Sequence, residues 1–544
     1  MRLATRLCGA LAALAFAASA QAQVVEREVP EGPVAIDSGR LAGKVLDSGV
    51  RAWFGVPFAA PPVRELRWRA PAPVKPWAGV FNADRFAPEC PQGLRAHNIN
   101  HYFGEEATSE DCLYLNIWAP PQKAEKLPVM VWIYGGGFSG GSASMANYAG
   151  ESLARKGVVY VSLAYRLGAL GFMAHPALSA EQGHSGDYGL MDQVAALQWI
   201  QRNIARFGGD PGNVTIMGQS AGAMSVSDLQ ASPMGKGLFH RAVGMSGSQL
   251  APSGFGSVGD RAQGEASGLA LQKALGVGSL AEMRDLPSDR ILQAARQLPG
   301  QAFAPIVDGH VLPDQPAALF AKGQQNDVPI LIGFTHDEVF SAIGRPRTLA
   351  DYQAEAARSY GDQAQAFLKL YPAKTEAQVR AVATEAGRDS SVGLAQWSWA
   401  RGQGSGKAPA YVFLFSRVHP YAPGITFADH DPASVGAYHT GDVPYWLQTQ
   451  DALNIFRQTR VWTPYDRQLA EQMSNALVTF ARTGDPSGGG LAWPRYEPRG
   501  EKLVEFGDSV AVRAWPNRDR LGFFAAHPAQ SGAPAAPPAN RARD

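Results

Sequence analysis

The chain has 544 residues, of which 18% are charged, and its formal net charge is +1. Its length exceeds the roughly 250–300 residues that one hydrophobic core usually reaches, but large α/β enzymes with insertions can run this long around one sheet. We therefore expect one elaborated domain. No basic stripe or acidic tract stands out, which argues against nucleic acid or a polyanion as the partner.

The first 22 residues have the composition of a signal peptide. Arg2 and Arg6 precede an apolar run over residues 7–18, and residues 20–22 read Ala-Gln-Ala, which is an Ala-x-Ala cleavage pattern. The apolar run has about a dozen residues, against the roughly 20 that span a bilayer, so cleavage is favoured over a membrane anchor. We expect an exported chain, periplasmic or secreted, from which residues 1–22 are removed.

Cleavage would leave two cysteines, Cys90 and Cys112. Two cysteines in an exported protein are expected to pair, because disulfides persist in oxidising compartments. Such a bridge would contribute on the order of 3 kcal/mol by restricting the unfolded chain. The alternative is a pair of unbonded, buried thiols.

Short apolar runs predict buried strands, and helical patterns lie between them. A helix that precedes the third of these strands is expected at residues 192–207, where Val194, Leu197 and Ile200 have helical spacing. Alternating strands and helices predict an α/β fold with a mostly parallel central sheet and helices on both faces. In chain order the strands are expected at residues 129–134, 158–164, 214–218, 242–245, 330–333 and 411–415.

Two helix-rich insertions are expected, at residues 255–300 and 345–400, and they should cover the carboxyl edge of the sheet and the active site. Residues 526–544 are rich in Pro, Ala and Ser and are predicted to form a disordered tail. No repeat or linker divides the remainder. Residues 23–525 are therefore predicted to form one domain.

The segment 214–223 is the most informative, because an apolar run leads there into Gly-Gln-Ser-Ala-Gly. The pattern is typical of a nucleophile elbow, in which Ser220 sits on a strained strand-to-helix turn with its hydroxyl exposed. The N–H of Ala221 then lies at the start of a helix, where it can donate to an oxyanion. Ser139 also lies in a Gly-x-Ser-x-Gly match, but no small-residue helix start follows it, so we interpret that segment as a glycine-rich loop.

Further motifs occur in order along the chain after residue 22. They are Phe-Gly-Val-Pro-Phe-Ala at 54–59, Glu-Asp-Cys-Leu-Tyr-Leu-Asn at 110–116, Tyr-Gly-Gly-Gly-Phe at 134–138, Asp-Pro-Gly-Asn at 210–213, and the elbow. Together they resemble the type B carboxylesterase and cholinesterase family of α/β-hydrolases, over nearly the whole chain after residue 22. The resemblance implies an α/β-hydrolase fold with no requirement for a metal or an organic cofactor.

The same resemblance implies several structural pairs. Cys90 and Cys112 would close a loop near the entrance of the gorge that leads to the active site. Two partly buried ion pairs are implied as well, and because a buried pair fixes geometry more reliably than it adds stability, their role would be architectural. These pairs are Arg67 with Glu110 and Arg166 with Asp192.

Ester cleavage by a serine needs a base that takes the hydroxyl proton, and in this fold the histidine lies well downstream of the serine. Residues 436–445 resemble the histidine segment of the family, which assigns the base to His439. His430 is the nearest rival. Its flanking aspartates and a following proline are more typical of a solvated turn.

An acid must orient the histidine and stabilise its charged form. Residues 335–340 resemble the acid segment of the family, which assigns this role to Glu338. Val339 replaces the usual glycine, so Asp337 stays open as the alternative. Asp308 matches a different segment and is interpreted as a turn aspartate.

Three glycines after an apolar strand can bring backbone N–H groups to a reacting carbonyl without obstruction by side chains. The resemblance assigns Gly136 and Gly137 as oxyanion-hole donors beside Ala221. Gln219 stands where the family usually has a glutamate, and its neutral amide removes one reason to expect a preference for quaternary ammonium esters.

Together these features predict a serine-dependent carboxylic ester hydrolase that acts on a small-molecule ester through an acyl-enzyme intermediate. The alternatives are a cholinesterase-like adhesion protein without activity, or hydrolysis of amides or polyesters by the same residues. The identity of the ester and the oligomeric state stay open at this stage.

Overall fold

The computed structural model describes residues 27–528 apart from 94–106, 252–255, 301, 339–345 and 405. The signal peptide and residues 529–544 of the expected tail lie outside the described residues, so both stay predictions. Val339 also lies outside the described residues, so its effect on the loop that carries Glu338 stays a prediction. Helix α16, Arg518–Ala526, ends at the residue where the tail was expected to begin.

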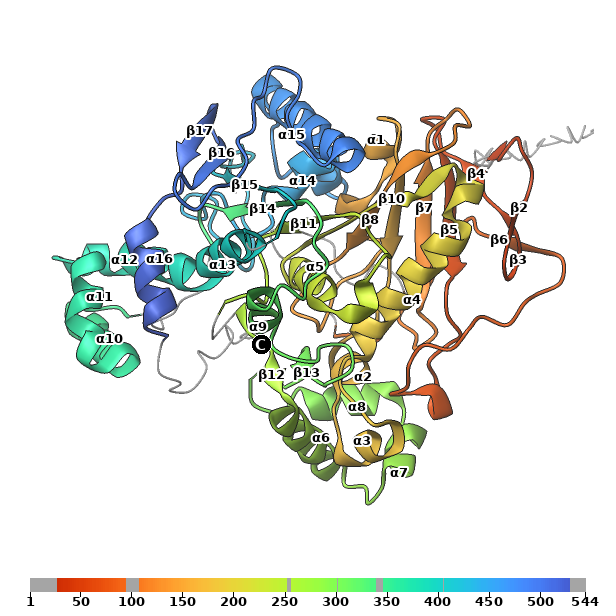
Figure 1. Cartoon of the computed structure of the whole chain (residues 1–544), viewed down its shortest axis with the longest axis horizontal. Helices are drawn as coiled ribbons and strands as arrows, with labels where there is room; N and C mark the ends of the chain where they lie inside the picture. Colours follow the sequence, from red (N-terminus) through yellow and green to blue (C-terminus); the bar gives the residue numbers. More distant parts are fainter. Residues whose placement is uncertain are drawn as a thin grey trace, which may run out of the picture.

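A sheet of twelve strands forms the centre of the described part of the chain (Figure 1). The seven neighbouring strands β9, β8, β10, β11, β14, β15 and β16 pair in parallel, whereas the strands toward the two edges pair antiparallel. In spatial order the strands are β1 (Arg27–Glu28), β4 (Lys44–Val45), β5 (Arg51–Pro57), β7 (Tyr114–Ala119), β9 (Val159–Leu163), β8 (Leu127–Ile133), β10 (Gly209–Gln219), β11 (Arg241–Met245), β14 (Ile330–Thr335), β15 (Ala410–Phe415), β16 (Lys502–Phe506) and β17 (Val510–Ala514).

The prediction of a mostly parallel α/β sheet is confirmed. Each of the six expected strands corresponds to a strand of the structure, namely β8, β9, β10, β11, β14 and β15. Their residues are almost all buried, as expected for strands that are covered on both faces. The edge strands were not predicted from the sequence. Two smaller sheets contain β2 (Val34–Ile36), β3 (Gly39–Ala42) and β6 (Val80–Asn82), and β12 (Gly259–Asp260) with β13 (Ile306–Val307).

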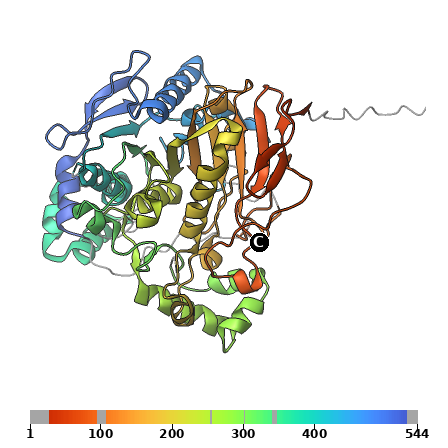
Figure 2. The same ribbon diagram turned by 45° about the vertical axis from the view of Figure 1, so that its right-hand side comes forward.

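Helices cover both faces of the sheet (Figures 1 and 2). The expected crossover helix is α4, which starts at Tyr188, earlier than predicted, and continues as a 3-10 turn to Phe207. Helix α5 begins directly after β10 and contacts β8, β10 and β11. Besides α16, the helices described outside the two insertions are α1 (Glu151–Ala154), α2 (Gly168–Phe172), α3 (Pro176–Gln182), α4 (Tyr188–Asn203), α5 (Ala221–Ala231), α9 (Pro316–Ala321), α14 (Val443–Trp446) and α15 (Pro464–Thr483).

Both insertions are helical, and Figure 1 shows them at the bottom and at the left of the molecule. The first contains α6 (Arg261–Leu275), α7 (Leu280–Asp285) and α8 (Ser288–Ala295). The second contains α10 (Leu349–Tyr360), α11 (Ala364–Leu370), α12 (Glu376–Arg388) and α13 (Leu394–Gln403).

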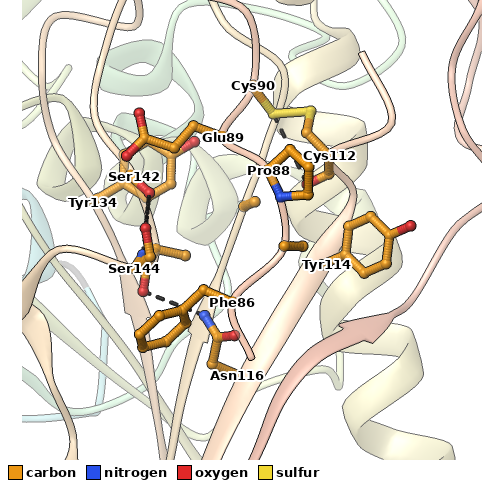
Figure 3. A pocket seen from close by; sticks show the side chains of 13 residues that line it. Phe86, Pro88, Glu89, Cys90, Cys112, Tyr114, Asn116, Tyr134, Ser142 and Ser144 are labelled. Carbon is orange, nitrogen blue, oxygen red and sulfur yellow. Dashed lines mark hydrogen bonds between the residues drawn. A yellow bond between two sulfur atoms is a disulfide. The ribbon is translucent and has the colours of Figure 1, made fainter. Parts of the chain in front are cut away.

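The structure pairs Cys90 with Cys112, and both cysteines are buried (Figure 3). The bond ties the segment after β6 to the start of β7, and so to the central sheet. A small pocket next to the disulfide is lined by residues of this segment and by Ser142 and Ser144, which follow the glycine loop after β8.

Both implied ion pairs are present. Asp192 is fully buried and accepts three hydrogen bonds from Arg166, one from its backbone N–H and two from its guanidinium, at 2.7–3.0 Å. Arg67 binds Glu110 through two nitrogens at 2.5 and 2.8 Å and also donates to backbone carbonyls around the end of α7, such as Leu286. The second pair therefore attaches the first insertion to the N-terminal part of the chain.

We predict that Asp192→Ala lowers the free energy of unfolding by about 3–5 kcal/mol, because it leaves the Arg166 guanidinium buried without its anion. Asp314→Ala is the matched control, because its partner Lys322 and Asp314 itself are exposed, and it should leave the free energy of unfolding almost unchanged. Urea unfolding followed by circular dichroism measures both. Equal losses in the two variants would contradict this account.

Candidate active site

Strand β10 passes into α5 through one residue, Ser220. Its backbone has φ 58° and ψ −127°, a conformation that is costly for a residue with a side chain. Its N–H donates to the carbonyl of Met245 at the end of β11, which holds the turn against the neighbouring strand. This is the strand–turn–helix arrangement that a nucleophile elbow requires.

Glycines allow the backbone to close tightly around this turn. A Cβ atom on Gly222 would overlap the carbonyl oxygen of Ile133 at the end of β8, and a Cβ on Gly218 would overlap Gly222. A Cβ on Gly135 would lie 2.9 Å from the Cβ of Ser220. The glycine loop after β8 therefore packs directly against the elbow.

Glu338 and His439 are brought together by two loops that pair with each other. Asp337 and Tyr438 form an isolated parallel β-bridge, and the N–H of Asp337 donates to Ala437 at 3.0 Å. The Asp337 carboxylate in turn accepts the N–H of Ala437 at 2.7 Å. Because neighbouring residues are held in register, Glu338 lies beside His439.

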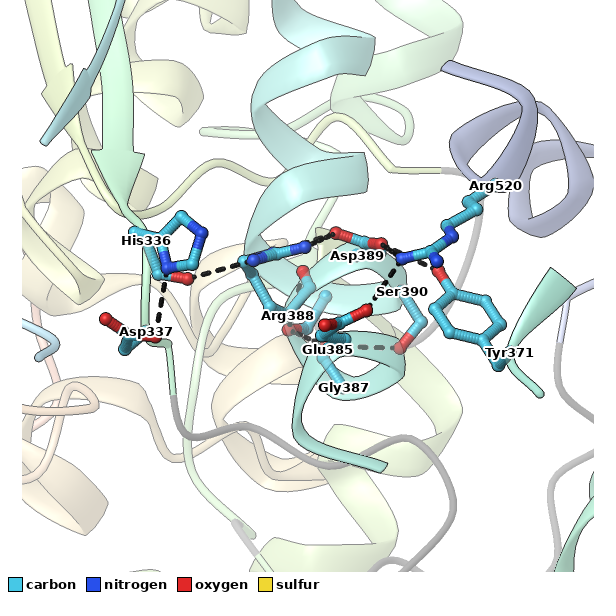
Figure 4. A network of polar contacts seen from close by, with 10 residues as sticks. His336, Asp337, Tyr371, Glu385, Gly387, Arg388, Asp389, Ser390 and Arg520 are labelled. Carbon is cyan, nitrogen blue, oxygen red and sulfur yellow. Dashed lines mark hydrogen bonds and ion pairs between the residues drawn. The ribbon is translucent and has the colours of Figure 1, made fainter. Parts of the chain in front are cut away.

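The loop after β14, which carries Asp337 and Glu338, is also held in place by residues of the second insertion (Figure 4). Arg388, at the end of α12, is buried and donates to the carbonyl of His336 at 3.1 Å. Its guanidinium is held by Asp389 at 2.8 Å. Asp337, the alternative acid, is engaged by His336 and by Ala437, whereas the imidazole of His439 is bound by Glu338.

Glu338 and His439 form a short hydrogen bond, with 2.6 Å between Oε2 and Nδ1. The other carboxylate oxygen, Oε1, accepts the hydroxyl of Thr335 at 2.9 Å. The side chain of Glu338 is fully buried, and that of His439 keeps 17% of its surface exposed. The acid is thus shielded from water while the imidazole stays accessible.

The hydrogen bonds define the tautomer of His439. Because a carboxylate only accepts, Nδ1 carries the proton. The opposite nitrogen, Nε2, lies 3.2 Å from Nε2 of Gln219, whose amide N–H donates to it. Nε2 therefore presents a lone pair toward the residue before Ser220, which is the form of histidine that can accept a proton.

Charges around His439 set its pKa. Burial alone lowers the pKa, but the nearby Glu338 carboxylate, its hydrogen bond and a further carboxyl group, Asp442, raise it above the ordinary histidine value. Asp442 is fully buried, and burial together with the charge of Glu338 raises its own pKa to about 7. The sequence analysis missed Asp442, although a carboxyl group three residues after the assigned base was a usable signal.

The loop with the expected oxyanion donors starts at the end of β8, which is paired with β10 as far as Ile133 and Gly218. Gly136 and Gly137 both have positive φ, 116° and 63°. Ala221 is the first residue of α5, where backbone N–H groups lack intrahelical partners. The structure therefore places Ala221 directly after Ser220, and it places Gly136 and Gly137 directly after Gly135, which packs against the Ser220 turn.

The rival residues lie in other settings. Ser139 is exposed on the glycine loop and donates to the carbonyl of Gly136. His430 lies beside Asp429, 2.9 Å away, and Asp308 accepts the N–H groups of the turn that follows it. Within the described ranges, no group of three or more His, Cys, Asp or Glu side chains is arranged to hold a metal ion.

Comparison with known proteins places this geometry in a family. The model of the carboxylesterase family matches residues 30–524. The chain is 38% identical to a fumonisin B1 esterase from Sphingopyxis macrogoltabida over 494 residues, which cover 87% of this chain and 86% of the relative. It is 32% identical to the para-nitrobenzyl esterase of Bacillus subtilis (strain 168) over 505 residues, or 89% and 96% of the two chains.

Solved structures agree with this relationship. A PNB esterase superposes with a TM-score of 0.76 at 32% identity, over 90% of this chain and 98% of that one. A thermophilic PNB esterase gives the same TM-score and identity. The chain belongs to the carboxylesterase family and is a carboxylic ester hydrolase with the α/β-hydrolase fold.

Proposed function

We propose that this protein is an exported serine esterase that forms an acyl-enzyme on Ser220, with His439 as the base and Glu338 as the acid that orients it. The observation that carries the proposal is the 2.6 Å hydrogen bond from His439 to the buried Glu338, on an imidazole that faces the elbow. A nucleophile, a base and an orienting acid are what acyl transfer by serine requires.

In the first half of the reaction, Oγ of Ser220 attacks the ester carbonyl while Nε2 of His439 accepts the hydroxyl proton. For this step the hydroxyl takes the place of the Gln219 amide at Nε2, since catalytic hydrogen bonds often form fully only with substrate bound. The C–O bond between the acyl carbon and the alcohol oxygen then breaks, and His439 gives the proton to the departing alcohol oxygen. An acyl ester remains on Ser220.

In the second half, a water molecule attacks the acyl carbon and gives its proton to His439. The bond to Oγ breaks, His439 returns the proton to Ser220, and the carboxylic acid leaves. Both halves pass through a tetrahedral oxyanion, for which Gly136, Gly137 and Ala221 supply N–H groups. Glu338 stabilises the imidazolium in each half without taking its proton.

The substrate is inferred to be a small-molecule carboxylic ester without a required cationic group. Gln219 is 1% exposed and neutral, whereas a glutamate at this position would add a negative charge beside the reaction centre. The names of the relatives point to esters of different size, a fumonisin in one case and a para-nitrobenzyl ester in the other.

Export is part of the proposal, on the basis of the sequence of residues 1–22. The Cys90–Cys112 disulfide supports it, because such bonds persist in oxidising compartments. Among the described residues, no helix combines the length and the apolar composition that a membrane span needs.

We predict that a fluorophosphonate probe labels the wild-type protein at Ser220 and that Ser220→Ala abolishes labelling. Ester turnover should fall at least about a thousandfold, because no other group supplies the nucleophile. Ser139→Ala is the matched control, since it removes the serine of the second Gly-x-Ser-x-Gly match, and the probe should still label this variant. An adhesion protein without activity would show no labelling in the wild type.

The activity should depend on pH through His439. Protonated His439 cannot act as base, and its pKa is raised, so kcat/KM should fall as the pH drops through a midpoint above about 6.5, the ordinary histidine value. Asp442→Asn removes a carboxyl group that raises this pKa, so its midpoint should lie at lower pH. A pH profile of each protein with one ester tests this. A midpoint that stays fixed or moves upward in the variant would contradict the assigned electrostatics.

A further inference from the structure

The side chain of Gln92 is bound to both backbone groups of one residue in the glycine loop, Gly141. Its Oε1 accepts the N–H of Gly141 at 2.8 Å, and its Nε2 donates to the carbonyl of Gly141 at 2.9 Å. Nε2 also contacts the carbonyl of Cys90 at 3.3 Å and the carboxylate of Glu89 at 3.2 Å. A two-way contact of this kind fixes both the position and the orientation of the Gly141 peptide groups.

Gly141 lies at the far end of the loop, but this end is folded back onto the near end. It has φ 116°, and a Cβ there would overlap the carbonyl oxygen of Gly135. A Cβ on Gly136 would likewise overlap the carbonyl oxygen of Gly140. The two ends of the loop are thus in direct backbone contact, with no room for one methyl group between them.

The near end of the loop contacts the nucleophile, as the 2.9 Å approach of a Cβ on Gly135 to Ser220 demonstrates. A shift of Gly141 would therefore pass through Gly135 and Gly136 to the groups that face the oxyanion. Close-packed backbone transmits such a shift because there is no void to absorb it.

Gln92 is itself held in place by its neighbours. Cys90, two residues earlier, is bonded to Cys112, which lies just before the buried strand β7. Glu89 is paired with residues 107–109, since its N–H donates to Ala107 and its carbonyl accepts from Ser109, both at 2.9 Å. The disulfide (Figure 3) and this short pairing tie the segment that carries Gln92 to the central sheet.

We propose that Gln92 is a positioning residue that holds the glycine loop in register with Ser220, and that the Cys90–Cys112 disulfide fixes Gln92 for this task. The inference rests on the proposed function, because the proposed function assigns N–H groups of this loop to the oxyanion. Gln92 acts through Gly141. Its loss should therefore weaken the stabilisation of the transition state and leave ground-state binding of the ester almost unchanged.

The test compares Gln92→Met with the wild type. Methionine keeps the length and the packing but removes every hydrogen bond. The expected result is a fall in kcat of roughly tenfold to a hundredfold, since small misplacements of a catalytic group cost this much, with KM within about twofold. Affinity for a trifluoromethyl ketone, whose adduct carries the oxyanion, should fall by the same factor. The pH midpoint should not move, because Glu338 and His439 are untouched.

Gln201→Met is the matched control. Gln201 is also partly buried and donates from Nε2 to two backbone carbonyls, of Pro211 and Leu238, but these lie outside the glycine loop. It should keep the wild-type kcat. If Gln92→Met changes kcat and ketone affinity no more than Gln201→Met does, the inference is overturned.

A second variant covers the case in which Gln92→Met does not fold. Gln92→Glu can still accept from Gly141, but its second oxygen would face the carbonyls of Gly141 and Cys90 and the carboxylate of Glu89, which it cannot bind. A loss of kcat at an unchanged melting temperature supports the inference, and an unchanged kcat overturns it. Failure of the proposed function is a separate result, because it would appear in the wild type as the absence of probe labelling at Ser220.

Discussion

The hydrogen bond between Glu338 and His439 is the interaction on which the site depends. It joins residues 101 positions apart in the sequence, and it is short because Asp337 and Tyr438 bridge the two loops. The carboxylate is fully buried, so it interacts with the imidazole in a medium of low dielectric constant. The same bond fixes the tautomer, raises the pKa of His439 and leaves Nε2 as the nitrogen that accepts a proton.

The elbow and the glycine loop depend on a different constraint, the close approach of backbone to backbone. Ser220 holds a strained conformation because Gly218, Gly222 and Gly135 let β8, β10 and α5 meet around it. Strain of this kind persists only where the surrounding structure fixes it. The parallel sheet supplies that frame, since the end of β8 lies beside the end of β10 and brings both loops to one edge.

The sequence predicted the central strands well, because each is a short apolar run buried on both faces. It did not predict β5, Arg51–Pro57, because a fully buried strand that contains glycine and ends in proline has no alternating pattern. The motifs identified the elbow and the two loops that the structure brings together. Gln92 could not be assigned from the sequence, since the contact that makes it notable joins segments tens of residues apart. The position of Asp442 was visible in the sequence, but its raised pKa arises from burial, which the sequence does not show.

A crystal structure of the protein after reaction with a phosphonate ester would test the central claim most directly. The account predicts phosphorus bonded to Oγ of Ser220, one phosphonyl oxygen about 2.7–3.1 Å from the N–H groups of Gly136, Gly137 and Ala221, and Nε2 of His439 turned from Gln219 toward Ser220. A phosphonyl oxygen that points to solvent, or an imidazole that stays separated from the modified serine, would contradict it.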